Sequence, residues 1–268
     1  MTSELTINLA ADRLCEATNR SRPVAPVRDL LTGIDDAYRV QQELVRRRTT
    51  ENARVVGRKI GLTSDAVQRQ LGVDQPDYGV LFDDMAYVDG ATVPTDRLLQ
   101  PRIEAEVAFV LAEDLRGDIG PAEVRAAVAA VLPALEIVDS RIADWDITIV
   151  DTVADNGSSG LYVLGSEPRS LDQVEPKDVK MTMAIDGAVV STGDGSACLG
   201  DPLAALLWLA RLADRTGDPL RAGQVVLSGA LGPMVPVALG NEIRAQIDPL
   251  GSVAVRIGVP ACEAEGQP

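Results

Sequence analysis

The stretch PRIEAEVAF, residues 101–109, places two carboxylates inside a run of otherwise apolar side chains. Successive side chains of a β-strand point to opposite faces, so Glu104 and Glu106 share one face and lie roughly 6.6 Å apart along the backbone. The run VAFVLA that comes next is apolar on both faces, which is typical of a strand that enters a core. Two neighbouring anions there repel each other and lose hydration, so the sequence predicts a nearby cation.

A third acid of the same kind is Glu136, which interrupts the apolar run VLPALEIV. Buried acids are usually paired or bound to a metal. From these features alone the three glutamates are compatible with a metal site, with a solvated polar face, and with ion pairs to Arg102 or Arg141.

None of the 268 residues is a histidine, which limits both the possible catalytic mechanisms and the possible metal ligands. Ser–His–Asp and Cys–His catalysis are excluded, and a general base must be Lys, Asp, Glu, Tyr or Cys. A metal would be held by oxygen ligands, and oxygen ligands select hard ions such as magnesium, manganese or calcium.

Charge and cysteine content indicate the cellular setting. A net charge of −15 disfavours nucleic acids and anionic membranes as partners. No apolar stretch is expected to be as long as a membrane span, and the N-terminus lacks the apolar core of a signal peptide. Three scattered cysteines predict reduced thiols in the cytoplasm rather than a disulfide framework.

The hydrophobic periodicity predicts a mixed α/β (α+β) protein that forms one domain, residues 1–268. Residues 1–53 have helical spacing, residues 54–258 are rich in β signals, and 259–268 form a tail. Expected elements are strands at 54–62, 134–140, 224–237 and 241–258, helices at 63–71 (capped by Thr63 or Ser64), 120–133 and 201–217, and a hairpin at 180–195 that turns at Asp186–Gly187.

Two further patches could carry chemistry. Lys59 shares a strand face with Gly57 and Gly61, which suits either an amine that faces a ligand or a surface lysine. The loop GVDQPDYGVLFDDM, residues 72–85, contains several aspartates of the kind that form turns. Composition does not distinguish Asp77 among them.

Taken together, the long motifs resemble those of the 2-keto-4-pentenoate hydratases, in the hydratase/decarboxylase branch of the fumarylacetoacetate hydrolase superfamily. The resemblance runs from about Leu9 to Ile257. It rests on GRKIGLTSDAVQRQLGVDQPDYGVLFDDM, LQPRIEAEVAFVL, VLPALEIVDSRI, DTVADNGSSGLYVLG and LSGALGPMV.

The resemblance implies a β-rich core, a helical N-terminal portion, a homo-oligomer and a divalent metal, Mg²⁺ or Mn²⁺. The family's metal ligands fall on Glu104, Glu106 and Glu136, and its acid/base pair falls on Lys59 and Asp77. Weaker candidates for substrate contacts are Ser158, Ser159, Ser228 and Gly229. Two positions depart from the family: Gly157 stands where alanine is usual, which would only loosen a turn, and Asp201 replaces a histidine, where we expect it to cap a helix.

The implied reaction adds water to 2-hydroxypenta-2,4-dienoate and gives 4-hydroxy-2-oxopentanoate, in the meta-cleavage catabolism of aromatic compounds. Two alternatives within the superfamily are a 4-oxalocrotonate decarboxylase and a hydrolase of carbon–carbon bonds in acylpyruvates. A third is a silent subunit that associates with neighbouring pathway enzymes. The presence of all the expected polar site residues disfavours a silent subunit.

Overall fold

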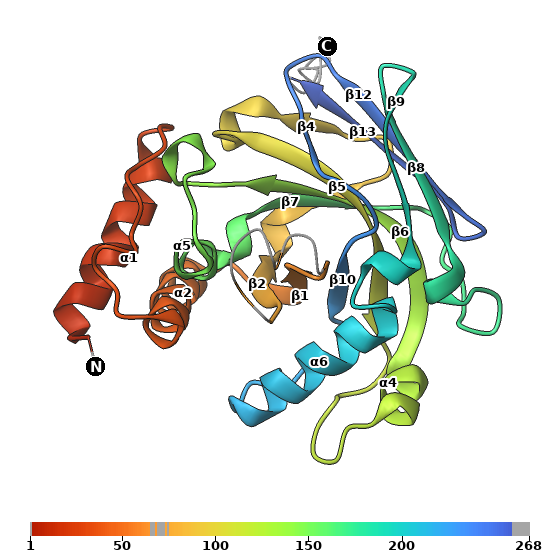
Figure 1. The fold of residues 1–268 in the computed structure, drawn as a ribbon, viewed down its shortest axis with the longest axis horizontal. Coiled ribbons are helices and arrows are strands. Elements are labelled where there is room, and N and C mark those ends of the chain that lie inside the picture. Colours follow the sequence, from red (N-terminus) through yellow and green to blue (C-terminus); the bar gives the residue numbers. More distant parts are fainter. Residues whose placement is uncertain (1, 65–67, 69–72, 74, 259–268) are drawn as a thin grey trace, which may run out of the picture.

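The computed structural model describes all residues of the chain except 1, 65–67, 69–72, 74 and 259–268. Helices come first, and after residue 54 strands predominate over helices (Figure 1). The structure therefore confirms the mixed α/β class with a helical N-terminal portion. The α-helices are α1 (Glu4–Asn19), α2 (Ile34–Thr50), α4 (Pro121–Ala127), α5 (Ile149–Ala154) and α6 (Pro202–Arg215).

The strands form two sheets. The eight-stranded sheet has the order β2-β1-β10-β5-β6-β7-β3, with β11 added to β5, and the five-stranded sheet has the order β4-β13-β12-β8-β9. The first sheet contains β1 (Val55–Gly61), β2 (Asp77–Phe82), β3 (Ala86–Val88), β5 (Pro101–Leu111), β6 (Val128–Asp139), β7 (Ser159–Leu164), β10 (Val225–Ala230) and β11 (Val235–Pro236). The second contains β4 (Thr92–Pro94), β8 (Lys180–Ile185), β9 (Ala188–Asp194), β12 (Glu242–Asp248) and β13 (Gly251–Gly258).

Apolar side chains of both sheets, with those of α4 and α6, form one large core. Phe109 of β5, Leu135 of β6 and Met183 of β8 are fully buried in it. In β12 buried and exposed residues alternate, so that strand has one wet face. Strand β6 is buried from Val131 to its end, so an acid on it is taken out of water.

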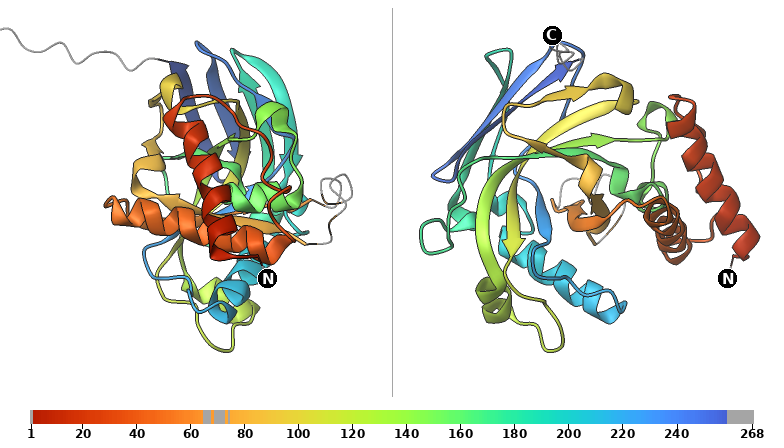
Figure 2. Two further views of the ribbon diagram at one scale, coloured as in Figure 1. Left: turned by 90° about the vertical axis from the view of Figure 1, so that its left-hand side faces the viewer. Right: turned by 180° about the vertical axis from the view of Figure 1, so that it is seen from behind.

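The N-terminal helices have a smaller core of their own. Ile7 and Leu14 of α1, Val40 of α2 and Val153 of α5 are buried together. Figure 2 shows α1 crossing α2 on the outside of the eight-stranded sheet. Helix α5 connects these helices to the strands, because it contacts both α2 and β2.

Several local predictions are confirmed. The hairpin of β8 and β9 turns at Asp186 and Gly187, both of which have positive φ angles, 52° and 82°. Helix α6 begins as expected: the Asp201 side chain accepts a hydrogen bond of 2.8 Å from the backbone N–H of Leu203. Aspartate thus serves as the structural cap that we expected at this position.

Two expectations were wrong, and a third cannot be judged. The helix predicted over 120–133 ends at Ala127, because from Val128 onward the chain pairs with β5 and sheet pairing overrides helical spacing. We expected no apolar stretch as long as a membrane span, but the segment 195–215 is long and apolar enough to be one. Within it, however, α6 buries Leu206 and Leu209 in the protein core. The helix predicted over 63–71 lies largely outside the described residues.

Candidate active site

Strands β5 and β6 bring the three predicted glutamates together. Their antiparallel register places Glu104 directly opposite Glu136, and Glu106 follows two residues along the same face. One carboxylate oxygen from each lies within 4.8 Å of the others. Glu106 and Glu136 are buried and Glu104 is partly buried, so the solvated polar face is the wrong interpretation.

The two arginines considered as partners of this cluster are engaged elsewhere. The Arg102 guanidinium stacks on the ring of Trp145, 4.4 Å from its centroid. Arg141 forms an ion pair of 2.5 Å with Asp155. The alternative of ion pairs from these arginines to the glutamates is therefore wrong.

The cation beside the glutamates is Lys59 of β1. Its Nζ lies 3.3 Å from Oε1 of Glu136, and both side chains are buried. Burial alone would lower the pKa of Lys59, but the carboxylates of Glu136, Asp77 and Glu104 outweigh it and raise that pKa. Lys59 is therefore an ammonium ion held within an acidic cluster.

Asp77, the first residue of β2, is a fourth buried carboxylate whose charge acts on Lys59. It pairs in register with Gly61 of β1, and a Cβ at Gly61 would come within 2.2 Å of Oδ1 of Asp77. Glycine at position 61 thus leaves the space that the carboxylate occupies. Burial raises the pKa of Asp77 to about 6, against the opposing effect of Lys59.

Several carboxylate oxygens of this cluster accept no hydrogen bond from the described residues: both of Asp77, both of Glu136, and Oε1 of Glu106. Burial raises the pKa of Glu104 to about 7 and that of Glu106 well above its ordinary value, in each case with the help of neighbouring carboxylates. Buried oxygens without donors are unusual in native proteins. Glu106 and Glu136 carry such oxygens, and together with Glu104 they place three carboxylates around one point, which fits a hard divalent cation.

The strand β10 contributes a backbone donor to the cluster. Its register with β5 shifts between Leu227 and Ala230, and within that bulge the N–H of Gly229 donates to Oε2 of Glu106 at 2.7 Å. Gly229 has a φ of 106°, a conformation that favours glycine. The buried thiol of Cys198 donates to the carbonyl oxygen of Gly229 at 2.9 Å.

The turn Asn156–Ser158 (η4) packs against Lys59 from another side. Gly157 has a φ of 63°, and a Cβ there would lie 2.7 Å from Cε of Lys59. The glycine therefore does more than loosen the turn, because it also leaves room for the lysine stem. The hydroxyls of Ser158 and Ser159 donate within the turn, to Asp155 at 3.4 Å and to the carbonyl of Asn156 at 2.8 Å.

The sequence profile of the fumarylacetoacetate (FAA) hydrolase C-terminal family matches residues 50–258, which include the whole acidic cluster with Lys59 and Asp77. The chain belongs to the fumarylacetoacetate hydrolase family.

Individual members of this family resemble the chain over nearly all its length. A TodF product hydratase from Pseudomonas putida is 54% identical over 250 residues, which are 92% of this chain and 93% of the relative. A 2-keto-4-pentenoate hydratase from Paraburkholderia xenovorans is 53% identical over 91% of this chain and 92% of the relative. The solved structure of 4-oxalocrotonate decarboxylase from Pseudomonas putida G7, complexed with magnesium and adipate, is 34% identical and has a TM-score of 0.92, covering 96% of this chain and 99% of that one.

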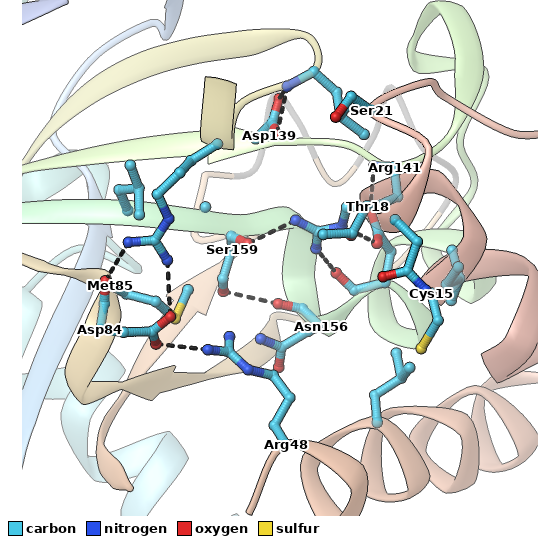
Figure 3. A pocket seen from close by; sticks show the side chains of 18 of the residues that line it. Cys15, Thr18, Ser21, Arg48, Asp84, Met85, Asp139, Arg141, Asn156 and Ser159 are labelled. Atoms are coloured by element: carbon cyan, nitrogen blue, oxygen red, sulfur yellow. Dashed lines mark hydrogen bonds and ion pairs between the residues drawn. The ribbon is translucent and has the colours of Figure 1, made fainter. Parts of the chain in front are cut away.

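A separate cavity of about 660 Å³ is lined by residues of α1, α2 and the η4 turn, and Lys59 is not among its lining residues. Asn156 and Ser159 line it, as Figure 3 shows, and several of its charged side chains are paired, for example Arg48 with Asp84 at 2.6 Å. Glu104, Glu106, Glu136 and Asp77 are not among the residues that line this cavity. The volume of this cavity is therefore no evidence that a reaction takes place in it.

Sequence reasoning missed Cys198 and Asn156, and it proposed Gly229 as a substrate contact rather than as the backbone donor to Glu106. Cys198 and Gly229 act through main-chain hydrogen bonds, for which the sequence carries only the weak signal of a glycine. Asn156 lies within one of the family motifs but carries no signal of its own there. The substrate contacts proposed for Ser158, Ser159, Ser228 and Gly229 stay predictions, and Ser228 is fully buried.

Proposed function

We propose that the chain is a metal-dependent hydro-lyase that adds water to 2-hydroxypenta-2,4-dienoate and releases 4-hydroxy-2-oxopentanoate. The observation that carries this proposal is a buried cluster of three glutamates beside Lys59 and Asp77, in a chain that is 54% and 53% identical to two hydratases over more than nine-tenths of its length. The relatives also support a role in the catabolism of aromatic compounds.

The residues that would hold the ion are Glu104, Glu106 and Glu136. When bound there, a divalent cation supplies Lewis acidity toward a 2-oxo acid and a template for it. Oxygen ligands favour Mg²⁺ or Mn²⁺. Magnesium, calcium and manganese in the solved structures of family members support a divalent ion, and the choice between the ions remains part of the proposal.

Lys59 and Asp77 would move the protons. The conversion needs a proton removed from the 2-hydroxyl and one delivered to C5, which gives the 2-oxo-3-enoate. Water then adds its hydroxyl to C4 and a proton to C3, so that the product gains one water molecule in total. Lys59 stays protonated in its acidic surroundings and can donate, and Asp77, with a pKa of about 6, can both accept and donate near neutral pH.

Lys59 has a second role in this proposal. Three carboxylates around one dication leave a net negative charge, and the substrate is itself a carboxylate. The ammonium of Lys59 offsets part of that repulsion, because it lies at ion-pair distance from Glu136. The geometry thus allows an anionic substrate to approach an acidic site.

Decarboxylation of 4-oxalocrotonate is the second candidate, favoured by the close structural match to the decarboxylase. The higher identity to the hydratases, 54% against 34%, supports hydration. Purified protein should be incubated with Mg²⁺ and either the dienol or 4-oxalocrotonate, with products followed by mass spectrometry and carbon dioxide measured. Release of carbon dioxide without hydration of the dienol would replace the hydratase with the decarboxylase.

The cellular setting belongs to the same proposal. We place the enzyme in the cytoplasm as a homo-oligomer that acts on a small-molecule substrate and associates with neighbouring enzymes of the pathway. The acidic composition and the match to bacterial catabolic enzymes support this setting.

A further inference from the structure

Strand β2 lies at the edge of the eight-stranded sheet, with β1 as its only strand neighbour among the described residues. An edge strand presents every second N–H and C=O group outward, without a partner strand. In β2 these outward groups belong to Tyr78 and Val80. Two side-chain amides bind them, one from the N-terminal helices and one from the η4 turn.

The first amide is that of Gln41 in α2. Its Nε2 donates to the carbonyl oxygen of Tyr78 at 2.8 Å and to that of Val153 in α5 at 3.2 Å. Gln41 is 1% exposed, although glutamine is usually a surface residue. A buried amide that joins three elements is expensive to place unless it is satisfied, so its contacts define where α2, α5 and β2 meet.

The second amide is that of Asn156. Its Oδ1 accepts from the N–H of Val80 at 2.8 Å, and its Nδ2 donates to the carbonyl oxygen of Val80 at 2.9 Å. This pair of bonds reproduces what a neighbouring strand would offer. Asn156 holds it from a left-handed backbone conformation, φ 55°, which asparagine adopts more readily than most residues.

Asp77 precedes Tyr78 directly and depends on the backbone for its position. Neither of its carboxylate oxygens is held by a hydrogen bond from the described residues. The path of β2 therefore sets where its side chain starts, with β1 on one side of the strand and the two amides on the other. Tyr38 of α2 adds packing, because its ring stacks on Tyr78 with centroids 5.0 Å apart.

We infer that Gln41 and Asn156 are positioning residues for Asp77, and that α2 is thereby a working part of the active site. This inference rests on the proposed function, since it assumes that Asp77 transfers a proton. The metal ligands lie on β5 and β6, which neither amide contacts, so the two residues should govern turnover and leave metal affinity unchanged.

The test is a double-mutant cycle with Gln41→Leu and Asp77→Asn, assayed for hydration of the dienol with saturating Mg²⁺. We expect Gln41→Leu to lower kcat about tenfold or more with KM changed less than about threefold, because leucine keeps the volume and loses both donors. In the Asp77→Asn background the same change should cost less than about threefold, because the residue that it positions is no longer active. Gln42→Leu, on the exposed face of the same helix, is the matched control and should match wild type.

Each other result decides against the inference. An equal loss from Gln41→Leu in both backgrounds would mean a general structural role, and wild-type turnover in Gln41→Leu would mean none. Asp77→Asn with full turnover would instead remove Asp77 from the proposed function. If Asp77→Asn leaves too little turnover to measure, Asp77→Glu replaces it in the cycle. If Gln41→Leu does not fold, Asn156→Asp, which keeps the acceptor for Val80 and loses the donor, runs the same cycle from the opposite side.

Discussion

Lys59 and Glu136 face each other across the eight-stranded sheet with 3.3 Å between Nζ and Oε1, and neither side chain is exposed to water. They come from β1 and β6, which are separated in the sheet by β10 and β5. Removal of one partner of such a buried charge pair destabilises the folded state, because it leaves the other charge buried without compensation. The pair therefore links the chemistry of the site to the stability of the fold.

Lys59→Met should lower kcat by about a hundredfold or more, the usual scale for a positioned acid or base. Methionine keeps the apolar stem and removes the charge and the exchangeable proton. Steady-state kinetics on the dienol would measure the loss, with the exposed Lys177→Met as the control. A rise in KM at constant kcat would make Lys59 an anion clamp rather than a proton donor.

Removal of divalent ions with EDTA should abolish turnover, and Mg²⁺ or Mn²⁺ should restore it. Glu106→Gln should weaken metal binding roughly tenfold or more, while the amide oxygen can still accept from the N–H of Gly229. Titration calorimetry would give the affinity, with the exposed Glu113→Gln as the control. Full turnover in metal-free protein would contradict the metal site.

Without metal, Glu106→Gln should stabilise the folded state, although it weakens metal binding. Burial and the neighbouring Glu136 and Glu104 raise the pKa of Glu106, which means that its charge is unfavourable in the folded state. A neutral amide removes that repulsion, so the variant should unfold at a higher urea concentration than wild type in EDTA. A lower urea midpoint for the variant would show that repulsion between the carboxylates does not destabilise the folded state.

Asp77→Asn should gain stability relative to wild type as pH rises in EDTA. The folded-state pKa of Asp77 is about 6, against an ordinary value of 3.8, so between these values the folded chain keeps a proton that the unfolded chain has released. Wild-type stability therefore falls as pH rises through this window, on the order of 1 kcal/mol for each unit, and asparagine is insensitive. Urea unfolding from about pH 4 to pH 6 measures the difference. Asp172→Asn, an exposed change, should show no such trend.

Asp201→Ala should destabilise the fold by about 1 kcal/mol and leave kcat unchanged, because Asp201 caps α6 and lies outside the acidic cluster. Asp201→Ser keeps an acceptor for the N–H of Leu203 and should recover most of that loss. Thermal unfolding with a parallel activity assay would separate the two quantities. A fall in kcat with unchanged stability would assign Asp201 to the active site.

The acidic cluster could be predicted because its signal is local. Alternation along one strand places Glu104 and Glu106 on one face, and an acid inside an apolar run marks Glu136 as costly. The glycines at positions 57 and 61 made Lys59 a candidate for facing a ligand, with a surface lysine as the alternative. Each of these arguments needs only a few consecutive residues.

The rest depends on pairings between segments far apart in the chain. Composition left Asp77 as one aspartate among several, and only the family resemblance singled it out; its place opposite Gly61 comes from the β1–β2 register. Gln41 and Asn156 bind main-chain groups of β2, and no spacing in the sequence indicates such bonds. The end of α4 was wrong for the same reason: its residues after Ala127 pair with β5, a contact that helical spacing cannot reveal.

The register of β5 and β6 has a consequence for how the chain reaches its native state. Glu104 stands opposite Glu136 in one alignment of these strands, and a slip by one residue would turn Glu136 to the other face. An ion that needs all three carboxylates therefore binds the correctly aligned chain and leaves slipped alignments untouched. At a hundred times its dissociation constant such an ion favours the native state by about 2.7 kcal/mol. If the three glutamates hold a divalent ion as proposed, that ion would also stabilise the correct alignment of β5 and β6 during folding, before any substrate is present.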